Sequence, residues 1–109
     1  MKRTPHILAC LVFLAGSSPL LAKGDPAKGK TFAYTCTGCH GIEEYKNAYP
    51  SYRVPKIGGQ NEQYIIAALT EYSKGERNHP TMTAQAQSFS AQDIADIAAY
   101  LSSLKPAAK

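Results

Sequence analysis

The residues best suited to chemistry form the run Cys36-Thr37-Gly38-Cys39-His40, in which two thiols are followed directly by an imidazole. This C-x-x-C-H order is the attachment signature of a c-type haem. Two thiols a short turn apart can each add across one haem vinyl group, and the next residue can then bind the iron as its proximal ligand. The run therefore predicts one covalently bound haem c, held through thioethers to Cys36 and Cys39 and ligated by His40.

Three other readings of the same run remain open. A thioredoxin-like C-x-x-C couple lies in a βαβ pattern, but no strand-like alternation flanks this one. A structural zinc site needs four Cys or His ligands, and the only other His or Cys beyond residue 22 is His79, at an irregular spacing. Chance is the third reading, because the motif is short. The haem reading is favoured because it also accounts for an export signal and a suitably placed methionine.

Residues 1–22 have the pattern of a secretory signal peptide. Lys2 and Arg3 form its basic start, residues 7–15 form the apolar run, and Ala22 offers a small residue at the cleavage site. We predict cleavage after Ala22, a mature monohaem domain of residues 23–109, and a periplasmic location. The alternative is an uncleaved anchor, but the apolar run is too short and broken for a hydrocarbon layer of ~30 Å. We therefore expect no stable membrane insertion after cleavage.

Cleavage would leave 87 residues with a formal net charge of +2, since Lys2 and Arg3 leave with the leader. Two haem propionates would bring that charge close to zero, so composition gives no argument for nucleic acid as a partner. The cut also removes Cys10, which leaves two cysteines for the thioethers and none for a disulfide. A chain of this size is marginal for an independent core, and a largely apolar macrocycle would supply much of it.

Capping residues and apolar periodicity predict three main helices and an all-α fold. Asp25 followed by Pro26 is typical of a helix start, and the apolar face of this helix is Gly29, Phe32, Ala33 and Cys36. Asn61 can cap a second helix that runs to about Ser73 and ends at Gly75. The clustered face of this second helix is expected to face the core and consists of Tyr64, Ile65, Ala68, Leu69 and Tyr72. The last helix begins with the capping-box pair Ser90 and Asp93, and its buried stripe is Ile94, Ile97, Ala98, Leu101 and Leu104.

The segments between these helices show no sustained period. Residues 41–59 are predicted to be an irregular loop stiffened by tyrosines and prolines, which would cover one face of the haem. Residues 74–87 are polar and are also predicted to be irregular. Lys23 and Gly24 are expected to be a frayed start.

Met82 is the predicted sixth ligand of the iron. It is the only methionine beyond the leader, and it lies in the polar segment just before the last helix. A methionine thioether favours the reduced iron and raises the potential relative to a second histidine. A gap-filling core methionine, ligation by His79 instead, and an open sixth site are the alternatives.

These features together resemble a class I c-type cytochrome over about residues 25–104. The run Pro55-Lys56-Ile57-Gly58-Gly59-Gln60, with Tyr64, Gly75-x-Arg77, Met82 and Asp93-Ile94-Ala95-Asp96, resembles one half of the bacterial dihaem cytochromes c and their single-domain relatives. The resemblance implies that the first and last helices cross, which would pair Gly29 and Phe32 with Tyr100 and Leu101. It also implies that the carbonyl of Pro55 accepts the Nδ1–H of His40.

The predicted function is that of a one-electron carrier. The protein is therefore predicted not to be an enzyme and to have no catalytic residues. Its partners would be a redox protein donor and an acceptor, such as a terminal oxidase or dehydrogenase. One alternative is a haem-bearing subunit of a dehydrogenase or oxidase complex. A haem enzyme or sensor is disfavoured, because it needs an open iron and distal acid–base groups. Lys46, Arg53, Lys56 and Arg77 could contact propionates or a partner, although solvated surface charges are the commoner case.

Overall fold

The computed structural model describes residues 21–41 and 54–104, which form helices and connecting turns without a β-strand. The elements in chain order are α1 (Pro26–Phe32), the 3-10 turn η1 (Ala33–Cys36), α2 (Thr37–His40), α3 (Glu62–Lys74), α4 (Pro80–Gln87) and α5 (Ala91–Ser103). The predicted all-α fold is confirmed. Most of the predicted leader, the basic residues Lys46 and Arg53, and the chain beyond residue 104 lie outside the described residues.

The predicted capping residues begin their helices. The Asp25 side chain accepts hydrogen bonds from the N–H groups of Ala27 and Lys28 at the start of α1. The Asn61 side chain accepts the N–H of Tyr64 at 3.0 Å, and Ser90 forms a capping box with Asp93 at α5. Each cap satisfies N–H groups that lack a partner within the first helical turn.

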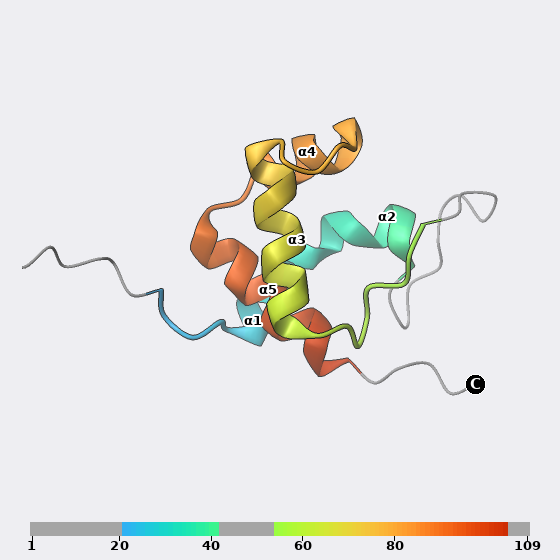
Figure 1. Cartoon of the computed structure of the whole chain (residues 1–109). Coiled ribbons are helices and arrows are strands. Elements are labelled where there is room, and N and C mark those ends of the chain that lie inside the picture. The colour runs from blue at the N-terminus through green and yellow to red at the C-terminus, as the bar shows by residue number, and fades with distance from the viewer. Residues whose placement is uncertain (1–20, 42–53, 105–109) are drawn as a thin grey trace, which may run out of the picture.

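Helices α1 and α5 pack side by side, and α5 also packs against α3, which in turn contacts α4 (Figure 1). The buried cluster at the centre is Ala33, Ile65, Ile97, Ala98 and Leu101. Three of these five residues belong to the predicted stripe of the last helix, and the stripe residue Ile94 is also buried. Leu104 is only partly buried and packs against this cluster. The last helix is thus the central element of the described fold.

The crossing of α1 and α5 requires glycine at position 29. A Cβ at Gly29 would overlap the backbone carbonyl of Asp96 and would lie 2.9 Å from the Cβ of Tyr100. Phe32 packs against the cluster that contains Leu101. The helix crossing implied by the family resemblance is therefore present.

The start of the domain is held more firmly than predicted. A Cβ at Gly24 would overlap the carbonyl of Ala95, and the N–H of Asp25 donates to Asp96 Oδ1 at 2.8 Å. The expectation of a frayed Gly24 is wrong. The expectation failed because these contacts join residues about 70 positions apart, and such contacts leave no signal in the local sequence pattern.

The prediction that residues 74–87 are irregular is also wrong, since Pro80–Gln87 forms α4. This helix buries only Ala86 and has a polar composition, so apolar periodicity did not reveal it. Its start does carry a local signal, because Pro80 occupies the first helical turn.

Candidate functional site

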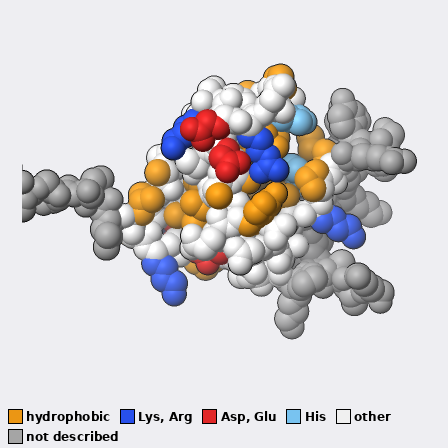
Figure 2. Space-filling view, viewed as in Figure 1, with side chains coloured by type: hydrophobic (Ala, Val, Ile, Leu, Met, Phe, Trp, Pro, Cys, Tyr) orange, Lys and Arg blue, Asp and Glu red, His pale blue; other side chains and the backbone are white. Residues whose placement is uncertain are grey.

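A cavity of about 850 Å³ lies between α2, α3, α4 and the segment 54–60. Its apolar lining includes Ile65, Leu69, Phe89, Ile97 and Leu101. Figure 2 shows two patches of histidine surface among hydrophobic side chains on one face of the molecule. A cavity of this size and lining falls in the range of cofactor sites, about 300–1,000 Å³.

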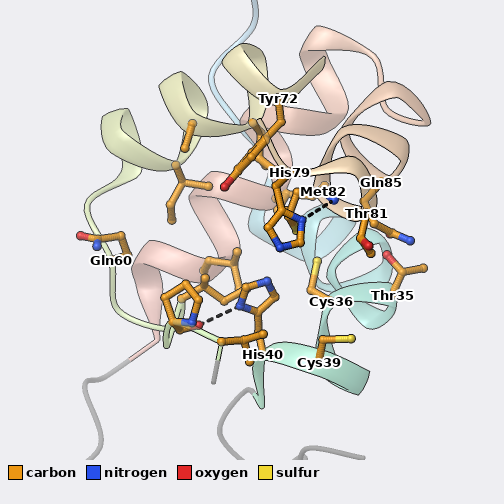
Figure 3. A pocket seen from close by; sticks show the side chains of 18 of the residues that line it. Thr35, Cys36, Cys39, His40, Gln60, Tyr72, His79, Thr81, Met82 and Gln85 are labelled. Atoms are coloured by element: carbon orange, nitrogen blue, oxygen red, sulfur yellow. Dashed lines mark hydrogen bonds between the residues drawn. The ribbon is translucent and has the colours of Figure 1, made fainter. Parts of the chain in front are cut away.

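All five predicted site residues line this cavity: Cys36, Cys39, His40, Pro55 and Met82. Figure 3 shows the two cysteines on one side of it, with His40 on one wall and Met82 on the opposite wall. The residues come from η1, α2, the segment after residue 53, and α4, so the fold gathers elements up to 46 positions apart.

The C-x-x-C-H run is helical throughout. Cys36 ends η1, and Cys39 and His40 form the last turn of the short helix α2. The Thr37 hydroxyl donates to the carbonyl of Tyr34 at 2.7 Å, and Gly41 ends the helix with a φ of 59°. This positive φ suits glycine, which carries no Cβ penalty there. The turn places the two thiols at different depths, with Cys36 half-buried and Cys39 exposed.

The surroundings of Cys36 differ from those of a redox-active thiol. Burial raises the pKa of the Cys36 thiol, and a hydrogen bond with the Thr35 side chain offsets this only in part. Redox-active C-x-x-C cysteines instead have lowered pKa values in electropositive, accessible surroundings. Together with the lack of strands in residues 21–41 and 54–104, this disfavours a thioredoxin-like site.

A structural zinc site is disfavoured on geometry. Over the described ranges, no group of three or more His, Cys, Asp or Glu side chains is arranged to hold a metal ion. His40 and His79 lie on different walls of the cavity (Figure 3). A zinc site would instead bring four such ligands to one point.

His40 is oriented by the segment that follows residue 53. Its Nδ1 lies 2.7 Å from the carbonyl oxygen of Pro55, which is the contact that the family resemblance implies. A carbonyl can only accept, so Nδ1 carries the proton and Nε2 keeps its lone pair. Metal-binding histidines characteristically show this second hydrogen bond. The imidazole is thus prepared to bind a metal through Nε2.

The opposite wall is built from the first turn of α4. Met82 is half-buried there, and its backbone N–H donates to His79 Nδ1 at 3.3 Å. His79 is the N-cap of α4, and Figure 3 draws this hydrogen bond as a dashed line beside the Met82 label. His79 therefore lines the cavity with one ring nitrogen already engaged by the backbone.

An arginine and two tyrosines occupy the part of the cavity beside α3. The Arg77 guanidinium donates to the Tyr64 hydroxyl at 3.3 Å and lies 5.1 Å from the ring centre of Tyr72. Its ion pair with Glu71, at 3.9 Å, is half-exposed and contributes little stability. Of the basic residues considered from the sequence, Arg77 and Lys56 line the cavity, and Lys46 and Arg53 lie outside the described residues.

Sequence reasoning missed several lining residues: Gln60, Tyr72, Thr81 and Gln85. Tyr72 was assigned to a core-facing helix surface, and that surface proves to be a cavity wall. Thr81 and Gln85 could not be placed because α4 itself was missed. The His79-Pro80 start was the available signal, because it sets Met82 and Gln85 three residues apart on one helical face.

The family model described as cytochrome c matches residues 26–105 of the chain. Cytochrome c4 of Pseudomonas aeruginosa is 36% identical over 100 residues, which are 91% of this chain and 48% of that protein. Cytochrome c-554(548) of Halomonas halodenitrificans is 42% identical over 83 residues, which are 73% of this chain and 96% of that protein. The thiosulfate dehydrogenase electron acceptor of Thiomonas intermedia is 35% identical over 71% of this chain and 35% of its own length.

The fold has a solved counterpart in the crystal structure of reduced recombinant cytochrome c4 from Pseudomonas stutzeri. The TM-score is 0.58 at 26% sequence identity, over 79% of this chain and 53% of that one. The chain thus spans about half the length of the cytochrome c4 proteins that it matches, and nearly the whole length of the Halomonas protein.

Proposed function

The chain belongs to the cytochrome c family, and we propose that it is a periplasmic one-electron carrier with a single covalently attached haem c. Cys36 and Cys39 would hold the haem by thioethers, and His40 and Met82 would ligate its iron. When bound, the haem supplies an iron that cycles between two oxidation states. The chain has no substrate to transform in this proposal, so it is not an enzyme.

Each site residue has a defined task in this proposal. The Cys36 and Cys39 thiols would hold the haem covalently, each through one thioether to a vinyl group. The carbonyl of Pro55, 2.7 Å from His40 Nδ1, fixes the orientation of the imidazole, so that Nε2 would be free to bind the iron. The Met82 thioether would be the second protein ligand of the iron, and it would raise the potential relative to a second histidine.

The observation that carries the proposal is the arrangement of the walls. A cavity of about 850 Å³ has His40 on one wall, Met82 on the other, and the cysteine pair at one edge (Figure 3). A haem c held by Cys36 and Cys39 and bound by His40 and Met82 would need its residues in these three positions. The arrangement supports ligation by His40 and Met82 over an open sixth site, which a haem enzyme or sensor requires.

The test is spectroscopic and chemical. Protein exported with haem attachment should keep its haem on a denaturing gel and gain the mass of one haem. The oxidised form should show the weak near-infrared band of a Met–Fe(III) bond. Absence of covalent haem would overturn the proposal. A high-spin spectrum would instead indicate an open sixth site, as in a haem enzyme or sensor.

The periplasmic location rests on the pattern of residues 1–22. The first close packing to α5 comes from Gly24, and the carbonyl of Ala22 accepts a hydrogen bond from Gln92 at 3.2 Å. Cleavage after Ala22 would cost this bond and leave the contacts of Gly24 and Asp25. No helix among the described residues is long and apolar enough to cross a membrane. N-terminal sequencing of the protein from a periplasmic extract tests both the location and the cut.

A second candidate is a haem-bearing electron-transfer subunit of a dehydrogenase or oxidase complex. The relative named as an electron acceptor of thiosulfate dehydrogenase favours it, as does the match to only half of longer proteins. In either case the partners are redox proteins, and the site chemistry is the same. Gel filtration of a native extract, followed by haem staining, separates a small free carrier from a large complex.

A further inference from the structure

His79 contacts the backbone of the predicted iron ligand. It caps α4, and its Nδ1 accepts the N–H of Met82 at 3.3 Å. The carbonyl of His79 also accepts the N–H of Thr83 at 2.9 Å, which closes the first turn of the helix. Met82 thus lies within a helical turn that is stabilised by two acceptors of His79, its ring Nδ1 and its backbone carbonyl.

The α4 helix has few other means of holding that turn. It is eight residues long and buries only Ala86. Short helices are marginal in water without tertiary packing, because forming the first turn is costly. The packing of α4 is against α3, where the rings of Tyr72 and His79 meet edge to face with centroids 6.4 Å apart. Tyr72 thereby holds the capping imidazole in place from the neighbouring helix.

We propose that His79 is a positioning residue for Met82: its imidazole caps α4 and keeps the thioether at the cavity wall, without binding the iron itself. This inference rests on the proposed ligation by Met82. The geometry favours a cap over a ligand, because Nδ1 already accepts a backbone hydrogen bond. Loss of the cap would free the first turn of α4 and let Met82 leave the iron more readily.

The experiment measures how readily an external ligand displaces Met82. Imidazole is titrated into the oxidised haem protein, and the Met–Fe(III) band reports displacement. His79→Ala removes the cap and should tighten apparent imidazole binding about fivefold, the factor that corresponds to a typical lost N-cap. The resting low-spin spectrum should persist, because Met82 is still present.

Two matched variants identify the cause. His79→Asn restores a capping side chain without an imidazole and should bind imidazole within about twofold of the wild type. Ser90→Ala removes the cap of α5 at a residue that does not line the cavity, and it should lower the free energy of unfolding while leaving imidazole affinity unchanged. If His79→Ala does not accumulate, His79→Gln replaces it, since glutamine fills the space but is a poor cap.

The outcomes separate this inference from the proposed function. Unchanged imidazole affinity in His79→Ala would overturn the cap. If His79→Asn binds imidazole as tightly as His79→Ala does, the effect comes from loss of the imidazole ring and the proposed cap is wrong. If Ser90→Ala tightens imidazole binding by the same factor, the effect comes from a general loss of stability, and the proposed cap is again wrong. Met82→Ala is the independent reference: if it leaves the iron spectrum unchanged, the proposed Met82 ligation fails instead.

Discussion

The two sides of α5 show opposite kinds of packing. Toward α1 the helices meet so closely that a Cβ at Gly24 or Gly29 would overlap the α5 backbone. Toward α3 and α4 the side chains surround a cavity of about 850 Å³, and Tyr64 on its wall is 51% exposed. Protein atoms fill the first side, and the second side encloses a cavity with a largely apolar lining.

This difference indicates how stability and function are divided. Close packing at the α1–α5 crossing fixes the chain around Cys36, which follows α1 by one turn. The cavity side carries the proposed haem ligands and an apolar lining that suits a largely apolar cofactor. We therefore expect substitutions at the crossing to change stability, and substitutions at the cavity to change haem properties.

The largest effect should follow the double change Cys36→Ser and Cys39→Ser. Without thioethers the haem is no longer held, and the apolar cavity loses the body that fills it. A small domain has only about 5–15 kcal/mol of stability, so we expect the apo-protein to be unfolded. Far-UV circular dichroism and protease digestion measure this, with each single variant as the control. A folded, helical double variant without haem would show that the crossing alone maintains the fold.

Met82→Ala should leave the fold intact and change the iron. Because Met82 is the proposed sixth ligand, its loss should open the iron to CO in the reduced form and lower the potential. Axial ligands set haem potentials over about 0.8 V, so a shift on the order of 0.1 V is expected. Redox titration and CO difference spectra are the measurements. An unchanged low-spin spectrum would assign the ligand to His79.

Gly29→Ala should destabilise the crossing without changing the haem spectrum. The new Cβ would overlap the carbonyl of Asp96, and overpacking of this kind costs about 1–3 kcal/mol. Gly58→Ala is the matched control, because its Cβ would be 3.5 Å from Leu104 Cδ1, an ordinary contact. Denaturant unfolding of the two variants should therefore differ. Equal stability of both would contradict the close crossing.

Asp96 should make the crossing sensitive to acid. The N–H of Asp25 lowers the pKa of this buried carboxyl, and a hydrogen bond from Gln92 and the charge of Lys28 lower it further. A lowered folded-state pKa stabilises the protein above the unfolded value of about 3.9, and this contribution is lost as pH falls through the folded pKa.

The matching variant is Asp96→Asn, which cannot ionise. At pH 7 it should be about 1–2 kcal/mol less stable than the wild type, since the N–H of Asp25 and the Gln92 amide would then donate to a neutral amide oxygen, which is a weaker acceptor than a carboxylate. The difference should shrink below about pH 4. Urea unfolding at a series of pH values measures it. A difference that is constant with pH would exclude the charge as the cause.

The smallest effect concerns docking at the cavity rim. Lys56 is exposed and lines the cavity, while acidic and basic side chains lie together on the neighbouring surface (Figure 2). Lys56→Glu should slow reduction by the partner a few-fold at low salt without shifting the haem spectrum, since rim charges act mainly on association rates. Lys30→Glu, on α1, is the control. Stopped-flow rates that are equal for Lys56→Glu and the wild type at low salt would remove Lys56 from the docking surface.

Much of the site was predictable because its signals are short. The C-x-x-C-H run occupies five residues, and each cap acts within three or four residues of its helix start. The starts at Asp25, Asn61 and Ser90 were therefore read correctly. Helix α4 was missed because its only local signal is the His79-Pro80 start, and its single buried residue creates no apolar stripe.

Residues close together along the chain were enough to predict the family resemblance, the all-α class, the candidate ligands and the starts of three helices. Three further contacts became known from the folded arrangement alone: Gly24 packs on α5, the N–H of Asp25 donates to Asp96 across 71 positions, and His79 caps the helix that carries Met82. These contacts depend on how distant segments pack against each other, and the spacing of neighbouring residues does not reveal that packing. The same packing turned the face of α3 that carries Tyr72 from an expected core surface into the wall of a cavity.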